Sequence, residues 1–291
     1  MSIDVKLTGH AKDLGGGFLV SRLLPAANRQ PVGPFVFFDH FGPLEVQAGD
    51  NHDVRPHPHI GLATVTYLFD GAILHRDSLG SVQRIEPGAI NWMTAGRGIV
   101  HSERAPEDLK DKAYLQHGLQ LWAALPQAHE ETAPDFVHTP ASDIPVVTLG
   151  AAEVRVLIGE AFGQTSPVKT FSKTVYLDIK LGAGGHLDLP PLAEELALYG
   201  VQGDLAVDGD ALAARTLAIL APGTATRITA TEPARFMVLG GDALDGHRFI
   251  WWNFVSSRKE RIMQAGDDWT AQRMGQVAGE TEFIPLPERK S

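Results

Sequence analysis

The sequence contains no cysteine in its 291 residues. This absence excludes disulfide bonds, a thiolate nucleophile, and zinc or iron–sulfur sites built on cysteine. Any metal bound by this chain must therefore be held by histidine and carboxylate side chains, and the sequence has 12 histidines.

Two further features are missing, an excess of positive charge and a long apolar run. The 25 Lys and Arg residues are outnumbered by 35 Asp and Glu residues, which gives a net charge of −10. That sign disfavours direct binding to nucleic acid or to an anionic membrane. No stretch reaches the roughly 18 apolar residues of a membrane-spanning helix, and charged residues interrupt the N-terminal segment where a signal peptide would lie. We expect a cytoplasmic protein.

The residues that are present are typical of a folded globular protein. Hydrophobic residues make up 44% of the chain and charged residues 21%, close to the average for soluble domains. The 30 Gly and 19 Pro residues separate short runs rich in Val, Ile, Leu and Thr, such as 63–69, 73–75, 82–85, 89–93 and 118–125. Short, closely spaced strands with turn residues between them predict an all-β sandwich or barrel.

The two halves of the chain resemble each other. Segment 67–71 (Tyr-Leu-Phe-Asp-Gly) is similar to 199–203 (Tyr-Gly-Val-Gln-Gly), 132 residues later, and 86–88 (Glu-Pro-Gly) is similar to 221–223 (Ala-Pro-Gly), 135 residues later. Two matches in the same order at nearly equal offsets predict a duplicated β domain. Proline-rich residues 126–145 are the expected linker. The predicted domains are therefore 1–135 and 136–291.

The C-terminal region predicts one α-helix. Ser257 and Glu260 have the spacing of a capping box, and Ile262 and Trp269 follow at helical spacing. Gly275 would end the helix, which we place at about 257–274. The aromatic run just before it, 251–254, is expected to pack in a core.

Two pairs of residues at alternate positions point to chemistry. His57 and His59 form one pair, and His101 and Glu103 form the other. Residues two apart on a β-strand face the same side, so all four side chains converge if the two strands are neighbours. Three imidazoles and one carboxylate suit a first-row divalent metal, Fe, Mn, Co, Ni, Cu or Zn, and leave coordination positions open for catalysis.

The second half of the chain is expected to bind no metal. The repeat offsets lead from the four candidate ligands to Leu189, Pro191, Phe236 and Val238, none of which can coordinate a metal. We therefore expect one metal ion, held in the first half.

The other histidines are weaker candidates. His52 and His75 lie near the two pairs in sequence and could support the site or lie on the surface, and His40 lies in an aromatic-rich segment. Structural roles are expected for His10, His117, His129, His138, His186 and His247.

At several blocks the sequence resembles the pirin family of the cupin superfamily. The blocks are 33–43 (Gly-Pro-Phe-Val-Phe-Phe-Asp-His-Phe-Gly-Pro), 55–61 (Arg-Pro-His-Pro-His-Ile-Gly), 92–103 (Trp-Met-Thr-Ala-Gly-Arg-Gly-Ile-Val-His-Ser-Glu), 117–122 (His-Gly-Leu-Gln-Leu-Trp) and 253–261 (Asn-Phe-Val-Ser-Ser-Arg-Lys-Glu-Arg). They are long, and they extend over nearly the whole chain.

The resemblance implies two cupin β-barrels of the jelly-roll (double-stranded β-helix) type. It also implies one metal ion, Fe(II), in the N-terminal barrel, with the family's ligands falling on His57, His59, His101 and Glu103. The activity implied is like that of quercetin 2,3-dioxygenase, in which O2 cleaves the heterocycle of a flavonol or a related polyphenol. In such a reaction Glu103 would accept the proton of the substrate's 3-hydroxyl group.

The resemblance leaves other roles open. The metal could control a surface that binds a partner protein, as in a transcriptional co-regulator or a modulator of a metabolic enzyme, without turnover. A cupin isomerase, or a dioxygenase for another substrate, is a third reading. Aromatic residues for a polyphenol would come from Phe35, Phe37, Phe38 or Trp92, although a core role is the usual one. We expect a monomer, because paired barrels can cover each other's faces within one chain.

Overall fold

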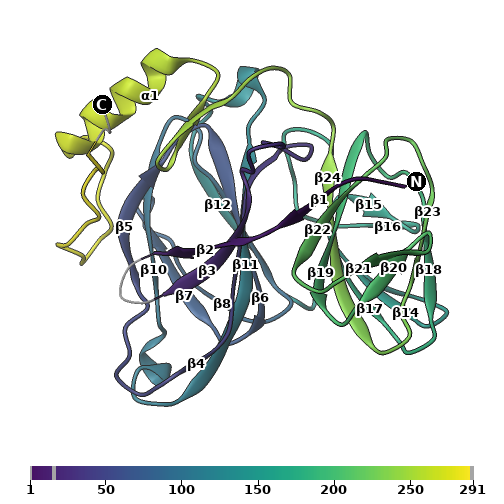
Figure 1. Ribbon diagram of the computed structural model, residues 1–291. Coiled ribbons are helices and arrows are strands. Elements are labelled where there is room, and N and C mark those ends of the chain that lie inside the picture. The colour runs from purple at the N-terminus through teal and green to yellow at the C-terminus, as the bar shows by residue number, and fades with distance from the viewer. Residues whose placement is uncertain (1, 15–17, 289–291) are drawn as a thin grey trace. The chain divides into compact units, whose positions relative to one another are not determined.

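The computed structural model describes residues 2–14 and 18–288, which form many β-strands and, within these ranges, a single α-helix (Figure 1). Contacts divide the chain into two compact units. We call the unit of 12–20, 39–141 and 245–291 the first barrel, and the unit of 1–11, 21–38 and 142–244 the second barrel. Each unit takes segments from distant parts of the chain, an exchange that a single predicted boundary after residue 135 did not anticipate.

The candidate ligands lie on a four-stranded sheet of the first barrel, with the order β5-β10-β7-β8. Its strands are β5 Val54–His59, β10 Ile99–Arg104, β7 Ile73–Asp77 and β8 Val82–Ile85. A seven-stranded sheet accompanies it: β12 Asp135–Thr139, β9 Ile90–Thr94, β6 Leu62–Asp70, β11 Tyr114–Ala124, β4 Phe35–Val46, β3 Leu19–Leu24 and β2 His10–Asp13. Two short 3-10 helices, η1 Glu107–Leu109 and η2 Gln127–His129, lie in its loops.

The second barrel repeats the same arrangement. Its seven-stranded sheet runs β1 Ile3–Thr8, β22 Thr216–Leu220, β19 Glu195–Gln202, β24 Ala234–Gly241, β17 Thr174–Leu181, β14 Ala152–Ile158 and β13 Val146–Leu149. Its four-stranded sheet runs β18 His186–Leu189, β23 Thr226–Thr229, β20 Leu205–Val207 and β21 Asp210–Leu212. A small hairpin, β15 Glu160–Ala161 with β16 Gln164–Thr165, completes the unit. The predicted all-β fold of two cupin barrels is confirmed.

Strand order accounts for one of the exchanged segments and for the predicted linker. β1 pairs with β22, so the first strand of the chain forms an edge of the second barrel's sheet. In the predicted linker, β12 pairs with β9 and forms an edge of the first barrel's sheet. Residues 135–139 are therefore structural rather than connecting.

Strand register gives the true alignment of the two repeats. Gly71 and Gly203 both have positive φ, +83° and +75°, which agrees with the offset of 132. After the next hairpin the offset is 127, because the Gly88 N–H donates to the Leu68 carbonyl as the Arg215 N–H does to the Gly200 carbonyl. The second sequence match was therefore misaligned. The cause is the β20–β21 hairpin, which is shorter than the β7–β8 hairpin.

The C-terminal helix α1 Lys259–Thr270 packs on the first barrel. Ile262, Ala265 and Trp269 lie on its buried face, as their spacing predicted, and join a cluster with Val100 on β10 and Phe254. Phe254 belongs to a hairpin, β25 Phe249–Trp251 with β26 Phe254–Ser256, which confirms a core role for this aromatic run.

The predicted limits of this helix were wrong at both ends. The N-cap residue is Arg258, which makes no side-chain capping bond. Ser257 is not the cap because its backbone N–H and hydroxyl donate to the buried carboxylate of Glu130. The helix ends at Thr270, before Gly275. Just after Thr270, the backbone N–H of Arg273 donates to the carbonyl oxygen of Asp268.

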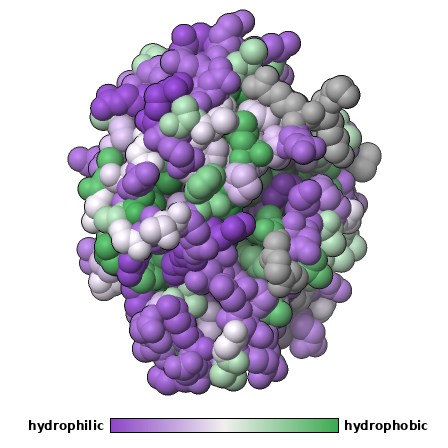
Figure 2. Space-filling model, turned by 90° about the vertical axis from the view of Figure 1, so that its left-hand side faces the viewer, coloured by the Kyte–Doolittle hydropathy of each residue, from purple (hydrophilic) through white to green (hydrophobic). Residues whose placement is uncertain are grey.

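Within the described residues, no helix is both long and apolar enough to cross a membrane. The face that carries α1 is covered largely by hydrophilic side chains, with hydrophobic residues scattered among them (Figure 2).

Gly96 and Gly223 occupy the same turn in the two repeats, with φ of +51° and +67°, and provide a matched test of packing. A Cβ atom on Gly96 would lie 2.1 Å from the Thr132 carbonyl oxygen, whereas none of the described atoms lies within 4 Å at Gly223. Both Ala variants carry left-handed backbone strain of about 1–2 kcal/mol, and only Gly96→Ala adds steric overlap, about 1–3 kcal/mol more. Denaturant unfolding should show the larger loss of unfolding free energy for Gly96→Ala. Equal losses in the two variants would contradict the close packing described at Gly96.

Candidate metal centre

The candidate ligands meet because β5 and β10 are antiparallel neighbours. His57 lies directly opposite His101, and His59 lies opposite Ile99. One ring nitrogen from each of His57, His59 and His101 can be chosen so that the three lie within 4.8 Å of one another. All three residues are buried. The structure thus brings together the three histidines chosen from the sequence.

Hydrogen bonds orient two of the three rings. The Nδ1 of His57 lies 2.9 Å from the Arg55 carbonyl oxygen, and the Nδ1 of His59 lies 3.2 Å from that of Asn253. A carbonyl oxygen only accepts, so each Nδ1 carries the proton and each Nε2 has a free lone pair. The Nε2 of His101 is buried without a hydrogen-bond partner. A buried ring nitrogen left in this way fits a metal ligand, so the residues present fit a divalent ion.

The electrostatics of the cluster favour neutral imidazoles. Burial lowers the pKa of His57 to about 4. Burial also lowers the pKa of His59 and of His101 well below the ordinary value, and the neighbouring imidazoles lower both further. All three rings are therefore neutral near pH 7, the form that binds metal.

Glu103 faces the same side of β10 as His101, but it lies outside the close group of three histidines. The β10–β5 register shifts between these two residues, so that Glu103 pairs with Val54. Its carboxylate is not part of the group of three histidines within 4.8 Å. Burial raises the pKa of Glu103 to about 7. Its role as the fourth ligand stays a prediction.

Two residues beside the cluster, His75 and Asp77, were not among the site residues predicted from sequence. His75, for which a surface position was left open, is buried with its Nδ1 3.4 Å from the Nδ1 of His101. Its Nε2 lies 2.9 Å from Asp77, which sequence reasoning missed. Burial would raise the pKa of Asp77, but hydrogen bonds from His75 and Ser81 hold that pKa below its usual value. The His-x-Asp spacing on one strand was the available signal.

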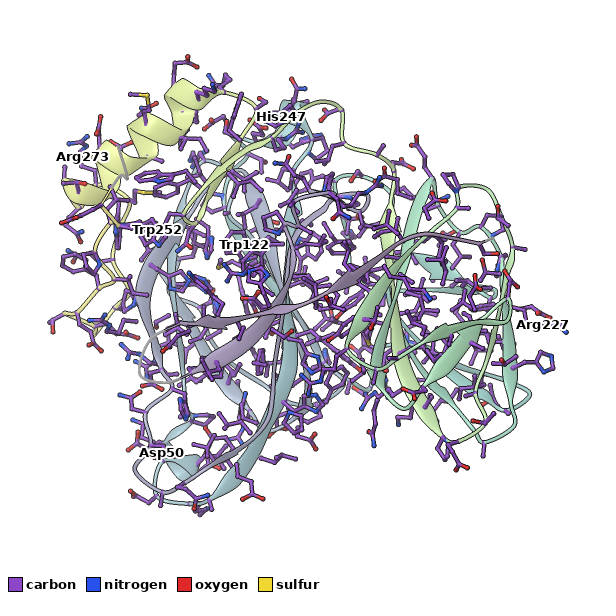
Figure 3. The ribbon with its side chains drawn as sticks, in the orientation of Figure 1. Asp50, Trp122, Arg227, His247, Trp252 and Arg273 are labelled. Atoms are coloured by element: carbon purple, nitrogen blue, oxygen red, sulfur yellow. The ribbon has the colours of Figure 1, made fainter. Side chains whose placement is uncertain are left out.

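An aromatic ring beside the cluster belongs to Trp122, which was not among the aromatic residues predicted to line a pocket. Its ring centroid lies 5.1 Å from that of His59, and Figure 3 shows Trp122 within the first barrel. Trp92 lies on β9 between Asn91 and Met93 and faces the opposite side of the sheet from both. Of the phenylalanines proposed for a pocket, Phe35 and Phe38 are fully buried and lie in the first part of β4, which groups by its contacts with the second barrel.

Polar side chains share the sheet face that carries Trp122. Trp122 pairs with Thr64 on β6, two residues from Thr66, whose cross-strand partners are Gln120 and Asn91. Cross-strand partners lie on the same face of a sheet. A row of three hydrogen-bonding side chains therefore lies on the face that turns toward the histidine cluster.

The second barrel has apolar residues at every position of the cluster. The β5–β10 pairing of the first barrel aligns with the β18–β23 pairing of the second. The pair His59 and Ile99 in the first corresponds to the pair Leu189 and Thr226 in the second. The positions of the four candidate ligands are thus taken by Leu187, Leu189, Ile228 and Ala230, all in one buried core cluster. The positions expected from sequence were all displaced: Leu189 corresponds to His59 and not to His57, and Pro191, Phe236 and Val238 correspond to none of the four ligands.

Comparison with known proteins places this architecture in a family. The family description "Pirin" matches residues 17–123, and "Pirin C-terminal cupin domain" matches residues 176–275. A pirin-like protein from Caulobacter vibrioides is 46% identical over 98% of this chain and 100% of its own length. Mouse pirin is 32% identical over 90% of this chain and 89% of its own.

A solved structure is similar over the same extent. The crystal structure of a quercetin 2,3-dioxygenase from Acinetobacter baumannii has a TM-score of 0.92 and 33% identity, covering 98% of this chain and 95% of that one. Two cupin barrels, the three clustered histidines and these matches lead to one conclusion. The chain belongs to the pirin family.

Proposed function

We propose that this pirin-family protein is a metal-dependent dioxygenase that cleaves the heterocycle of a flavonol, such as quercetin, with O2, and that the metal is Fe(II). The observation that carries the proposal is the cluster of three buried, neutral imidazoles in one barrel, beside a carboxylate of raised pKa. The substrate class is supported by similarity to a protein described as a quercetin 2,3-dioxygenase.

His57, His59, His101 and Glu103 would hold the ion. When bound, the metal supplies a Lewis acid that lowers the pKa of the substrate's 3-hydroxyl group and orients substrate and O2. Glu103 accepts the proton of that hydroxyl at a carboxylate oxygen. The ring opens with loss of carbon monoxide.

The substrate's other oxygen atoms would bind the polar row of Thr66, Asn91 and Gln120. The second barrel serves as an internal reference for this row. Its aligned residues are Leu198, Ala218 and Val238, which pair with one another in the same way and belong to the apolar core. The fold therefore does not need polar side chains at these positions, and a flavonol, with hydroxyl groups around a flat ring system, can use them.

The first experiment measures O2 uptake together with carbon monoxide. The protein is loaded anaerobically with Fe(II), its metal content is measured, and quercetin is added. We expect uptake matched by release of carbon monoxide from the wild type. His101→Ala should retain the fold by circular dichroism and lose both metal and activity. If the metal-filled wild type neither takes up O2 nor releases carbon monoxide, flavonol cleavage is refuted, and partner binding or another substrate is favoured.

The pKa of Glu103 predicts a proton count for metal binding. Below about pH 7 this carboxyl carries a proton in the metal-free protein, and a ligating carboxylate must lose it, whereas the neutral imidazoles lose none. Binding of Zn(II) should therefore release about one proton at about pH 6 and almost none at about pH 8. Calorimetry in buffers of different ionisation enthalpy measures this count. Glu103→Gln should abolish the pH dependence, and a wild type that behaves like this variant would remove Glu103 from the ligand set.

Replacing the polar row by the second barrel's residues tests substrate binding. Asn91→Ala and Gln120→Val should each raise the KM for quercetin about 2–10-fold, the usual value of one hydrogen bond. Metal content should stay at the wild-type level. Gln47→Val, at an exposed position, is the matched control. An unchanged KM in both interior variants would show that the substrate does not reach this face.

A further inference from the structure

Asp77, His75 and His101 form a chain of hydrogen bonds that ends at the histidine cluster. The three side chains are buried, with residue exposures of 1%, 4% and 1%. We infer that Asp77 and His75 are positioning residues that fix the ring tautomer of His101, so that its Nε2 keeps a lone pair for the metal. The inference rests on the metal site of the proposed function but does not depend on the substrate or on turnover.

The chain of bonds starts from a carboxylate whose own orientation is fixed. The backbone N–H groups of Leu79 and Ser81 donate to Oδ1 of Asp77, at 2.9 and 3.0 Å. Oδ2 is thereby turned to the Nε2 of His75, 2.9 Å away. A carboxylate only accepts hydrogen bonds, so a neutral His75 ring carries its proton on Nε2 and has a lone pair on Nδ1.

That lone pair determines the state of His101. The two Nδ1 atoms are 3.4 Å apart, and since His75 accepts there, His101 must carry its proton on Nδ1. Its Nε2 is then free of hydrogen. Phe136 stacks on the His75 ring, with centroids 4.1 Å apart and planes 10° from parallel, and keeps that ring in the required plane.

His101 differs in this respect from the other two histidines. The Nδ1 atoms of His57 and His59 face backbone carbonyls, which accept regardless of any side chain. Only His101 has a partner, another imidazole, that could either donate or accept. Asp77 removes this ambiguity, as carboxylates commonly do in the outer shell of metal-bound histidines.

The second barrel shows that the fold itself does not require this chain of bonds. Val207 pairs with Ile228 there as Asp77 pairs with His101, so Asp77 corresponds to Val207 and His75 to Leu205. Leu205, Val207 and Ile228 lie together in the apolar core. The same strands pack without polar residues where no ligands are present, so the chain of bonds accompanies the histidine cluster and not the fold.

Asp77→Asn is the decisive variant because it changes one hydrogen-bonding atom at constant shape. Oδ1 still accepts from the two backbone N–H groups, so the new amide NH2 takes the place of Oδ2 and donates to the Nε2 of His75. The His75 proton then moves to Nδ1 and points at His101, which must accept at Nδ1 and carry its own proton on Nε2. The nitrogen intended for the metal is blocked.

The test uses metal-free and Ni(II)-titrated full-length protein. In the metal-free wild type at mildly alkaline pH, 15N-detected imidazole spectra should show His101 protonated on Nδ1, and in Asp77→Asn on Nε2. Ni(II) affinity should fall about 10–100-fold in Asp77→Asn, the range typical of lost outer-shell partners. An unchanged tautomer or an unchanged affinity in Asp77→Asn would overturn the inference.

A second substitution separates tautomer control from the loss of a negative charge. Adding His75→Leu to Asp77→Asn removes the ring that transmits the wrong tautomer, so most of the lost Ni(II) affinity should return. If Asp77 acted only through its charge or through folding, the double variant would bind no better than the single one, and the inference would fail.

The pair His75→Leu and Asp77→Val, copied from the second barrel, controls for folding. It should unfold as cooperatively as the wild type and bind Ni(II) more tightly than Asp77→Asn. Failure of the wild type to bind Ni(II) at all would refute the metal site itself. Ni(II) binding without any effect of Asp77→Asn would refute only the role of these two residues.

Discussion

The antiparallel pairing of β5 with β10 is the interaction on which the candidate metal centre depends. It sets His57 beside His101 on one face of the small sheet. On the other face, Val100 packs against Ile262 and Trp269 of α1 in one apolar cluster. A slip of one residue would turn Val100 inward and the imidazole outward, at the cost of this packing. Hydrophobic contacts on the outer face thus secure the register that collects the histidines on the inner face.

The two repeats allow a comparison of the same sheet with a polar and with an apolar interior. In the second barrel, Leu187, Leu189 and Ile228 fill the positions of the three imidazoles and join a continuous core. In the first barrel these positions hold groups that lose hydration when buried and regain it only in part through hydrogen bonds. Burial keeps the imidazoles neutral, so the cost in stability and the readiness to bind a metal have one cause.

Much of this arrangement could be predicted from the sequence. Alternation along two short segments predicted that His57 and His59 share a face, as do His101 and Glu103, and turn residues between short strands predicted the all-β fold. Local patterns could not reveal which strands would be neighbours across the two repeats. β1 completes the second barrel, although its sequence gives no sign of its partner β22, because edge pairing depends on the folded sheet.

Errors arose where a local signal competed with a tertiary contact. Ser257 has the spacing of a capping residue, but the buried Glu130 carboxylate needs hydrogen-bond donors, and Ser257 supplies two of them. The Pro-Gly pairs at 87–88 and 222–223 look alike, yet the shortened β20–β21 hairpin places them in different turns. Asp77 was missed because its function depends on His75 and His101, a contact visible only in the folded barrel.

The hydrogen bond from His59 to the Asn253 carbonyl links the cluster to a residue 194 positions farther along the chain. During synthesis on the ribosome, every strand of the second barrel is made before Asn253 appears. Until then the His59 ring lacks the acceptor that orients it, and β5 and β10 lack the helix that covers them. The centre encoded by residues 57–103 is therefore completed only after the strands of the second barrel have been made, and a ribosome that stops directly after them leaves it incomplete.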